Sequence, residues 1–413
     1  MSPSAKKPSL GAVFLTMFLD ILGFSMVLPF LGEEARKNFG ATTFVASLLA
    51  TSYSLMQFVF VPVWGRLSDR IGRRPVMVWS VFATLLGTMA LFGSLVYGNH
   101  IGWLFAARLA SGVATANIGT ASAYIADVTK PEDRAKGMAL IGISFGFGFI
   151  IGPALGGYLA ESWMPTGRAG ALPCLISVGL STINFVWVLF GFVESLPKEK
   201  RSASARSGRP LDWAATRATL SRPGIGIAVL VNFVIILSFT SLEQTFRFFN
   251  ADKFALTARQ TGIIFGFIGV CSLAVQGGLV RRLSGKVPEA KMIRAGLLFQ
   301  ALAFGLLSVA PRFGVWALYA AGAVLALGNG LSQPSVSAYI SKRADASEQG
   351  MILGTSQGFA SLARAFGPAL GGFLYGAVGP SFPYQTSAVG MLVALALALS
   401  LDKGGPQKAT ATA

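Results

Sequence analysis

The chain has 413 residues, of which 53% are hydrophobic and only 12% are charged. Soluble globular proteins carry about 25% charged residues, so this composition excludes an ordinary soluble protein of several domains. The formal net charge of +17 lies at the ends of long apolar runs, which favours orientation in a membrane over nucleic-acid binding.

Twelve apolar runs follow one another along the chain, each close to the 20 or so residues that an α-helix needs to cross a bilayer. The first run is too long for a signal-peptide core and lacks a cleavage site, so we expect a retained helix. Most Lys and Arg fall in connections on one side, which predicts two cytoplasmic termini. The runs cover residues 10–31, 43–63, 76–97, 101–124, 137–160, 171–193, 224–246, 260–280, 292–310, 313–336, 350–376 and 381–401.

An internal repeat divides these runs into two sets of six. Ser122–Ile125 recurs as Ser337–Ile340, and Gly152–Gly157 recurs as Gly367–Gly372, in both cases 215 residues further along. The repeat runs in the same direction in both halves, which indicates a parallel duplication with a substrate path between two pseudo-symmetric bundles.

The one long connection supports this division. Residues 194–222 are rich in Lys, Arg, Ser and Ala and show no apolar periodicity, which predicts a flexible cytoplasmic linker. We therefore expect an N-terminal six-helix bundle over 1–193 and a C-terminal one over 223–413.

A polar segment, Gly65–Pro75, separates the second and third runs and contains four arginines and one aspartate. Such charges predict an interfacial loop on the cytoplasmic side. The glycines permit tight turns, and Asp69 can accept hydrogen bonds from helix N-terminal amides and pair with an arginine. The second copy has Gly285 where the first has Asp69, so the pair is asymmetric.

This segment resembles the signature loop of the major facilitator superfamily, and the resemblance covers nearly the whole chain. It implies an all-α membrane protein with twelve transmembrane helices in two pseudo-symmetric six-helix bundles. It also implies a gating loop that holds the halves together in the outward-open state; the alternative is that the arginines only enforce topology. The gating residues would be Gly65, Asp69, Arg70, Gly72, Arg73 and Arg74.

Small residues in the fifth run are similar to the antiporter signature of the same superfamily. Small residues at every fourth position give a smooth helix face, and a proline adds a kink. A tight seal between the fifth and eleventh runs would limit leak, although ordinary helix packing is an alternative. The residues are Gly148, Gly152, Pro153, Gly156 and Gly157.

Asp20, Arg108 and Glu243 are charged residues that lie within apolar runs. A cation such as Arg108 costs about 2.5–3.5 kcal/mol at a helix centre and needs a partner. Asp20 lies at a similar depth and is a candidate to pair with it, while Arg247 is placed to pair with Glu243. Arg108 resembles the fourth-helix arginine that the family ties to proton transfer. We assign all three to proton coupling; structural ion pairs are the alternative.

Polar residues in other runs are candidates for a substrate cavity. Glutamines offer neutral hydrogen-bonding groups to a bound solute, and a buried arginine can neutralise an anionic solute or satisfy local carbonyls. The candidates are Gln57, Gln276, Gln300 and Arg364.

Within the superfamily, the chain resembles the tetracycline-efflux type of drug–proton antiporter at Leu19, Asp20, Gly23 and Pro29 and over Tyr53–Phe58, Tyr124–Thr129 and Ser144–Gly148. The chain departs from that group where the group carries polar residues tied to metal–tetracycline and proton handling: it has Gly87, Ser272 and Gln300. These departures argue against tetracycline itself as the substrate.

The sequence thus predicts a secondary transporter that exports small amphipathic or lipophilic compounds by alternating access, driven by a proton gradient. The alternatives are a proton-coupled or facilitative carrier of a metabolite, lipid or sugar and, further removed, a non-transporting membrane receptor. We expect no enzyme activity, cofactor, metal or nucleic-acid partner, since a phosphate-binding loop and paired His or Cys ligands are absent from the sequence. We also expect a monomer in a bacterial inner membrane.

Overall fold

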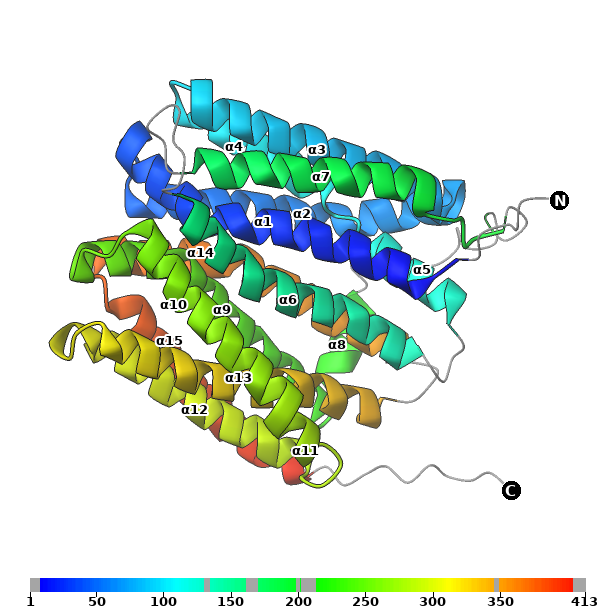
Figure 1. The fold of residues 1–413 in the computed structure, drawn as a ribbon. Helices are drawn as coiled ribbons and strands as arrows, with labels where there is room; N and C mark the ends of the chain where they lie inside the picture. Colours follow the sequence, from blue (N-terminus) through cyan, green and yellow to red (C-terminus); the bar gives the residue numbers. More distant parts are fainter. Residues whose placement is uncertain are drawn as a thin grey trace. The chain divides into compact units, whose positions relative to one another are not determined.

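The computed structural model describes residues 8–129, 134–160, 170–197, 201, 213–344 and 349–403. Within these ranges the chain forms helices joined by short connections and no strand (Figure 1). The helices are α1 (Leu10–Phe39), α2 (Thr43–Ile71), α3 (Arg73–Tyr97), α4 (Ile101–Ala114), α5 (Ile118–Val128), α6 (Arg134–Ala160), α7 (Ala171–Gly191), α8 (Trp213–Leu220), α9 (Ile225–Phe254), α10 (Ala258–Ala274), η4 (Val275–Val280), α11 (Arg281–Leu283), α12 (Glu289–Val309), η5 (Ala310–Arg312), α13 (Trp316–Arg343), α14 (Gln349–Ala377), α15 (Phe382–Ala398) and η6 (Leu399–Lys403).

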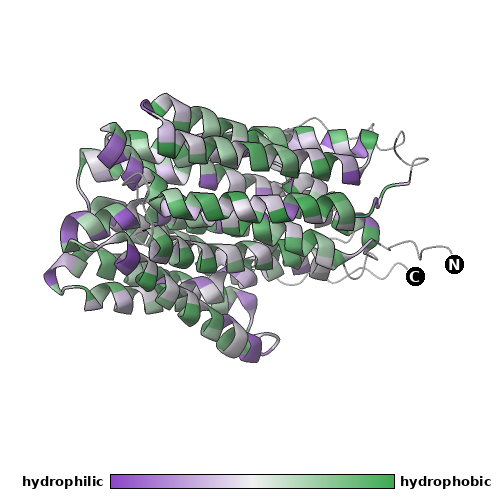
Figure 2. Ribbon diagram, turned by 45° about the horizontal axis from the view of Figure 1, so that its top comes forward, coloured by the Kyte–Doolittle hydropathy of each residue, from purple (hydrophilic) through white to green (hydrophobic). Residues whose placement is uncertain are grey.

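These helices confirm the predicted fold class. In the described ranges, each of the twelve apolar runs coincides mainly with one helix, except that the fourth is divided between α4 and α5 and the eighth between α10 and η4. Nine helices in the described ranges are long and apolar enough to cross a membrane. Figure 2 shows hydrophobic residues along the helix bodies and hydrophilic residues gathered towards the helix ends.

The chain divides into two compact units. Unit 1 comprises residues 1–210 with 256–266, and unit 2 comprises residues 211–255 with 267–413. In unit 1, α1 lies beside α6 and α7, and α3 lies beside α4 and α7 (Figure 1). In unit 2, α9 packs on α14 and α15, and α12 packs on α13.

Several helices differ from the predicted runs. Helix α1 continues to Phe39, where the left-handed Gly40 ends it (φ 64°), because a polar residue ends an apolar run without ending a helix. The fourth apolar run is broken into α4 and α5, and in the eighth α10 passes into the π-helix η4. The predicted flexible linker contains a short helix, α8.

The repeated small-residue segment makes the same contact in each unit. In unit 1 the Ser25 hydroxyl on α1 donates to the Gly148 carbonyl on α6, at 2.7 Å. In unit 2 the Thr240 hydroxyl on α9 donates to the Ala363 carbonyl on α14, at 3.4 Å. Both pairs are related by the same spacing of 215 residues, so the duplication extends to the hydrogen bond that joins the helices.

Candidate functional site

The segment Gly65–Pro75 is not the polar loop that its charges suggest. Helix α2 runs through Gly65 to Ile71, α3 begins at Arg73, and only Gly72 lies between them, with φ 106°. None of the residues from Arg66 to Ile71 breaks a helix, so α2 ends where a residue of positive φ reverses the chain. The segment Gly65–Pro75 is therefore a sharp junction between α2 and α3.

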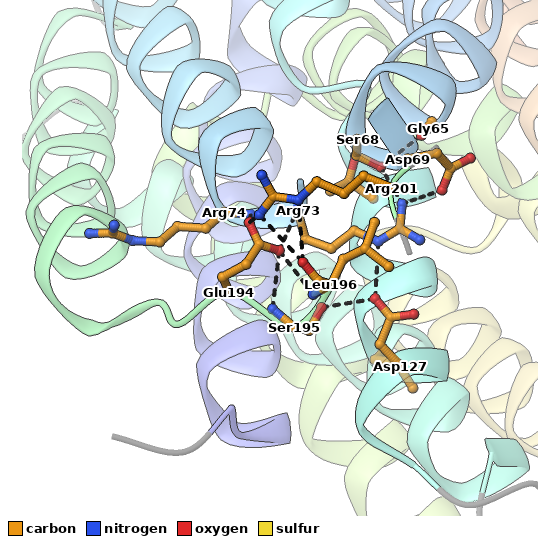
Figure 3. A network of polar contacts seen from close by, with 12 residues as sticks. Gly65, Ser68, Asp69, Arg73, Arg74, Asp127, Glu194, Ser195, Leu196 and Arg201 are labelled. Carbon is orange, nitrogen blue, oxygen red and sulfur yellow. Dashed lines mark hydrogen bonds and ion pairs between the residues drawn. The ribbon is translucent and has the colours of Figure 1, made fainter. Parts of the chain in front are cut away.

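Arg73 lies at the centre of this junction and is only 5% exposed (Figure 3). Its Nη1 donates to the Ser68 hydroxyl (2.7 Å) and to Asp69 Oδ1 (2.5 Å). Its Nε donates to Asp127 Oδ2 on α5, at 3.1 Å. The predicted pairing of Asp69 with an arginine is confirmed, and the same guanidinium also joins α2 and α3 to α5.

Glu194, which follows α7, caps the N-terminus of α3. Its Oε1 accepts from the Arg73 backbone amide at 2.9 Å, and its Oε2 accepts from that of Arg74 at 3.3 Å. The same carboxylate pairs with Arg201 at 3.3 Å. The N-cap position Gly72 provides no side chain, so a distant carboxylate supplies the negative charge that a helix N-terminus favours. The prediction that Asp69 would cap these amides is wrong.

The remaining residues of the predicted gating set lie around this centre. The Ser68 hydroxyl donates to the Gly65 carbonyl at 2.7 Å, and Arg74 Nη2 donates to the Leu189 carbonyl on α7 at 2.9 Å. Arg70 is exposed.

Sequence reasoning missed two carboxylates of this network, Asp127 and Glu194. Asp127 also accepts from the Ser195 hydroxyl at 2.9 Å, which links the ends of α5 and α7 (Figure 3). Glu194 directly follows the sixth apolar run and Asp127 lies three residues after the fourth, and that position is the signal that could have found them.

Asp20 on α1 is half-buried and is held by two asparagines. Its Oδ2 accepts from Asn117 Nδ2 at 3.2 Å, and its Oδ1 accepts from Asn184 Nδ2 on α7 at 2.8 Å. Asn184 Nδ2 also donates to the Thr16 carbonyl, while its Oδ1 is buried without a hydrogen-bond partner among the described residues. In the described part of the chain, no ion pair joins Asp20 to Arg108, so the predicted pair is not formed.

The break between α4 and α5 lies directly beside this aspartate. The consecutive carbonyls of residues 113–115, where α4 ends, accept hydrogen bonds from side chains of other helices. Trp64 Nε1 donates to the Val113 carbonyl at 2.7 Å, the Ser80 hydroxyl to that of Ala114 at 2.6 Å, and Gln57 Nε2 to that of Thr115 at 3.2 Å. Non-helical backbone at membrane depth requires such partners. Gln57, a predicted cavity residue, thus contributes to this structure.

Arg108 on α4 is 3% exposed and is surrounded by aromatic rings. Its guanidinium carbon lies 4.4 Å from the centre of the Tyr53 ring and 5.0 Å from that of Phe24, and its Nε donates to the Leu49 carbonyl. Cation–π contacts offset part of the cost of burying the charge. Its Nη2 is buried without a hydrogen-bond partner in the described part of the chain.

Glu243 on α9 is 3% exposed, and its Oε1 has no hydrogen-bond partner among the described residues. The predicted ion pair with Arg247 is not formed within those ranges. Next to it, the Thr245 hydroxyl contacts that of Tyr384 on α15 at 3.4 Å. Unit 2 therefore buries a carboxyl group with an unused acceptor.

The other predicted cavity residues do not form one cluster. Gln300 is buried and its Nε2 donates to the Ser332 hydroxyl at 2.6 Å, which joins α12 to α13. Gln276 is exposed in η4, and Ser272 is half-buried on α10. Arg364 Nη2 donates to the Ser361 hydroxyl at 3.0 Å on its own helix, α14.

The predicted antiporter residues of α6 lie mainly against α1. A Cβ at Gly148 would meet Ile21, one at Gly152 would meet Ser25, and one at Gly156 would meet the Met26 carbonyl. Pro153 lies within the helix, and Gly157 faces Gly262 of the same unit. In unit 2, Gly367 and Gly371 face α9 in the same way. These glycines permit the close approach of α6 to α1 and of α14 to α9.

Gly87, one of the departures from the tetracycline group, also has a packing role. A Cβ there would lie 2.5 Å from the Ser111 hydroxyl on α4, so the missing side chain permits close contact between α3 and α4.

Comparisons with known proteins agree with this architecture. The family model described as Major Facilitator Superfamily matches residues 13–311 and 249–412. The crystal structure of the human organic anion transporter MFSD10 (TETRAN) covers 94% of this chain and 98% of its own, with a TM-score of 0.72 and 24% identity, which shows the fold.

Curated relatives span nearly the full length. The tetracycline resistance protein, class C, of Escherichia coli is 28% identical over 96% of this chain and 97% of its own length. Multidrug resistance protein 2 of Bacillus subtilis is 26% identical over 93% and 92%, and major facilitator superfamily domain-containing protein 10 of Mus musculus is 26% identical over 90% and 88%. The chain therefore belongs to the Major Facilitator Superfamily and is a multi-pass membrane transporter.

Proposed function

We propose that this transporter exports small amphipathic or lipophilic compounds in exchange for protons. The observation that carries the proposal is Asp20, a half-buried carboxyl group held, within the described ranges, by two amides and by no cation. A carboxylate that is held by neutral groups can take up a proton without leaving a buried opposite charge unpaired. A proton can therefore bind and leave at this position.

Glu243 gives unit 2 a second group of the same kind. A buried carboxyl with an unused oxygen is costly when it is ionised, so a proton or a bound solute has to compensate its charge. Two such groups, one in each unit, suit a cycle in which protons and solute compete for the same protein states.

The relatives support an exporter of drug-like compounds over a carrier of sugars, because their names include tetracycline and multidrug resistance. Gly87, Ser272 and Gln300 argue against tetracycline itself, because Gly87 has no side chain and neither a serine nor a glutamine exchanges protons as a carboxyl group or a histidine does. We further propose a monomer with both termini in the cytoplasm, bundles over 1–193 and 223–413, and a bacterial inner membrane as its site.

The test uses purified protein in vesicles with an imposed pH gradient and a panel of lipophilic fluorescent compounds. We expect at least one compound to move against its gradient while protons move the other way. Asp20→Asn and Glu243→Gln should each reduce gradient-driven transport on the order of tenfold or more, because neither amide exchanges protons.

Glu289→Gln is the matched control. This carboxylate lies at the start of α12 and pairs with Lys342 outside the apolar stretch, so its loss should leave transport unchanged. Proton-independent movement of a sugar or metabolite by the wild type would overturn the proposal in favour of a facilitative carrier.

A further inference from the structure

We propose that α5 is a lever that carries the protonation state of Asp20 to the junction of α2 and α3, with Asn117 as the positioning residue at its near end. The inference rests on the proposed function insofar as Asp20 exchanges protons. Its mechanical part concerns unit 1 alone.

The first step is the near end of α5. Asn117 is the residue that precedes α5, is 1% exposed, and donates through its Nδ2 to Asp20 Oδ2. An ionised carboxylate accepts this bond strongly, whereas a protonated carboxyl is a weaker acceptor. In the described ranges, the groups that hold the carboxylate are Asn117 and Asn184, and neither of them titrates.

The second step is the far end. Asp127 lies in the last turn of α5, ten residues or about 15 Å beyond Asn117. Its Oδ2 accepts from Arg73 Nε and from the Ser195 hydroxyl. Ser195 is next to Glu194, which holds the first amides of α3. A displacement of α5 along its axis therefore acts on Arg73 and on the α3 cap together.

The third step is the separation of α5 from α4. The helix is interrupted at Thr115–Asn117, and the carbonyls of residues 113–115, where α4 ends, accept from Gln57, Trp64 and Ser80. Helix α4 is thus anchored without α5. Between its two carboxylate contacts, α5 packs through Ala121, Tyr124 and Ile125 in the core of unit 1, so we expect it to shift as one rigid body.

The experiment measures backbone hydrogen exchange of the full-length protein in nanodiscs, at the Arg73 and Arg74 amides. Asp20→Asn, which keeps the size of the side chain and removes its charge, should raise exchange on the order of tenfold, the change expected when one charge-assisted hydrogen bond is lost. Asn117→Ala should do the same. Neither measurement requires a substrate or a proton gradient.

Two variants serve as controls. Asn184→Ala removes the other amide on Asp20 from α7, and Ser122→Ala removes a hydroxyl on α5 that bonds within its own helix. Both should leave exchange at Arg73 and Arg74 within about twofold of the wild type. Equal effects from Asn117→Ala and Asn184→Ala would contradict the lever and indicate general loosening around Asp20.

A double variant tests whether the two ends act through one path. Asp127→Asn should raise exchange at the α3 amides by itself, and adding Asp20→Asn should give no further increase. Additive effects would overturn the inference. If the lever holds while vesicles show no proton-coupled export, only the proposed function fails; if export holds and exchange does not respond, only the lever fails.

Discussion

Two buried guanidinium groups in unit 1 are satisfied in different ways. Arg73 has three side-chain acceptors, of which two are carboxylates, and each charge-assisted bond contributes about 1.5–3 kcal/mol. Arg108 has one carbonyl and two rings, and desolvated cation–π contacts contribute about 2 kcal/mol. Arg73 is therefore fixed in place, while Arg108 keeps one donor for another partner.

Gln300 gives a prediction at the same scale. Because its amide bonds to Ser332 between α12 and α13, Gln300→Leu should lower the free energy of unfolding by about 1–3 kcal/mol, the cost of leaving a buried hydroxyl unpaired. Thermal unfolding in detergent measures this. The folded fraction should transport the same compounds as the wild type. A changed selectivity would instead indicate that Gln300 contacts the substrate.

The close contact of α1 with α6 is the clearest feature at the level of elements. The α6 glycines contribute no Cβ, so the α6 backbone lies directly against side chains and backbone of residues 21–30 of α1. Small residues allow this in a membrane, where apolar side chains gain little from leaving lipid. The same arrangement between α9 and α14 shows that the two units share this helix contact as well as the sequence repeat.

This contact predicts a strong asymmetry between glycines of one helix. Gly156→Val should disrupt folding, because its side chain would enter the Met26 carbonyl, and overpacking costs about 1–3 kcal/mol. Gly142→Val should be tolerated, because a Cβ at Gly142 would have no neighbour within 4 Å. Yield of monodisperse protein and its melting temperature are the measurements, and equal loss in both variants would point to helix propensity alone.

The sequence could predict the helices and the repeat, because apolar length and repeated segments depend on residue types alone. It could not predict the break at Thr115–Asn117, since the residues that stabilise it lie on α2 and α3. Asp20 and Arg73 are recognisable as functional candidates from their residue types and positions. Their distant partners are not, because these lie 97 and 164 residues from Asp20 and 54 and 121 residues from Arg73. Such pairings depend on tertiary packing.

At the scale of the whole molecule, the two copies of the repeat differ at the charged junction that contains Asp69 in unit 1. In unit 1, α2 continues through Asp69, so the carboxylate faces Arg73 one turn on. In unit 2, α11 ends at Leu283, and Gly285 takes a left-handed conformation with φ 79°. The glycine ends the helix before any counterpart of the junction can form.

This difference predicts where substitutions impair transport. Asp69→Asn should slow turnover on the order of tenfold while membrane insertion and substrate affinity stay near wild type, because Arg73 loses one of its charged acceptors. Gly285→Asn, which tolerates the left-handed conformation, should have little effect. Turnover and binding are measured separately in vesicles and by thermal shift, and a loss of affinity in Asp69→Asn would contradict the assignment.

The stabilised break between α4 and α5 has a consequence for mutational scans. The backbone groups it exposes are satisfied by Gln57, Trp64 and Ser80, which lie 34 to 58 residues from the carbonyls they serve. Intolerance to substitution should therefore concentrate on these three donors, including replacement by residues of equal size that lack the donor. In a scan of all substitutions, the interruption between α4 and α5 would therefore be detected as sensitive positions on α2 and α3.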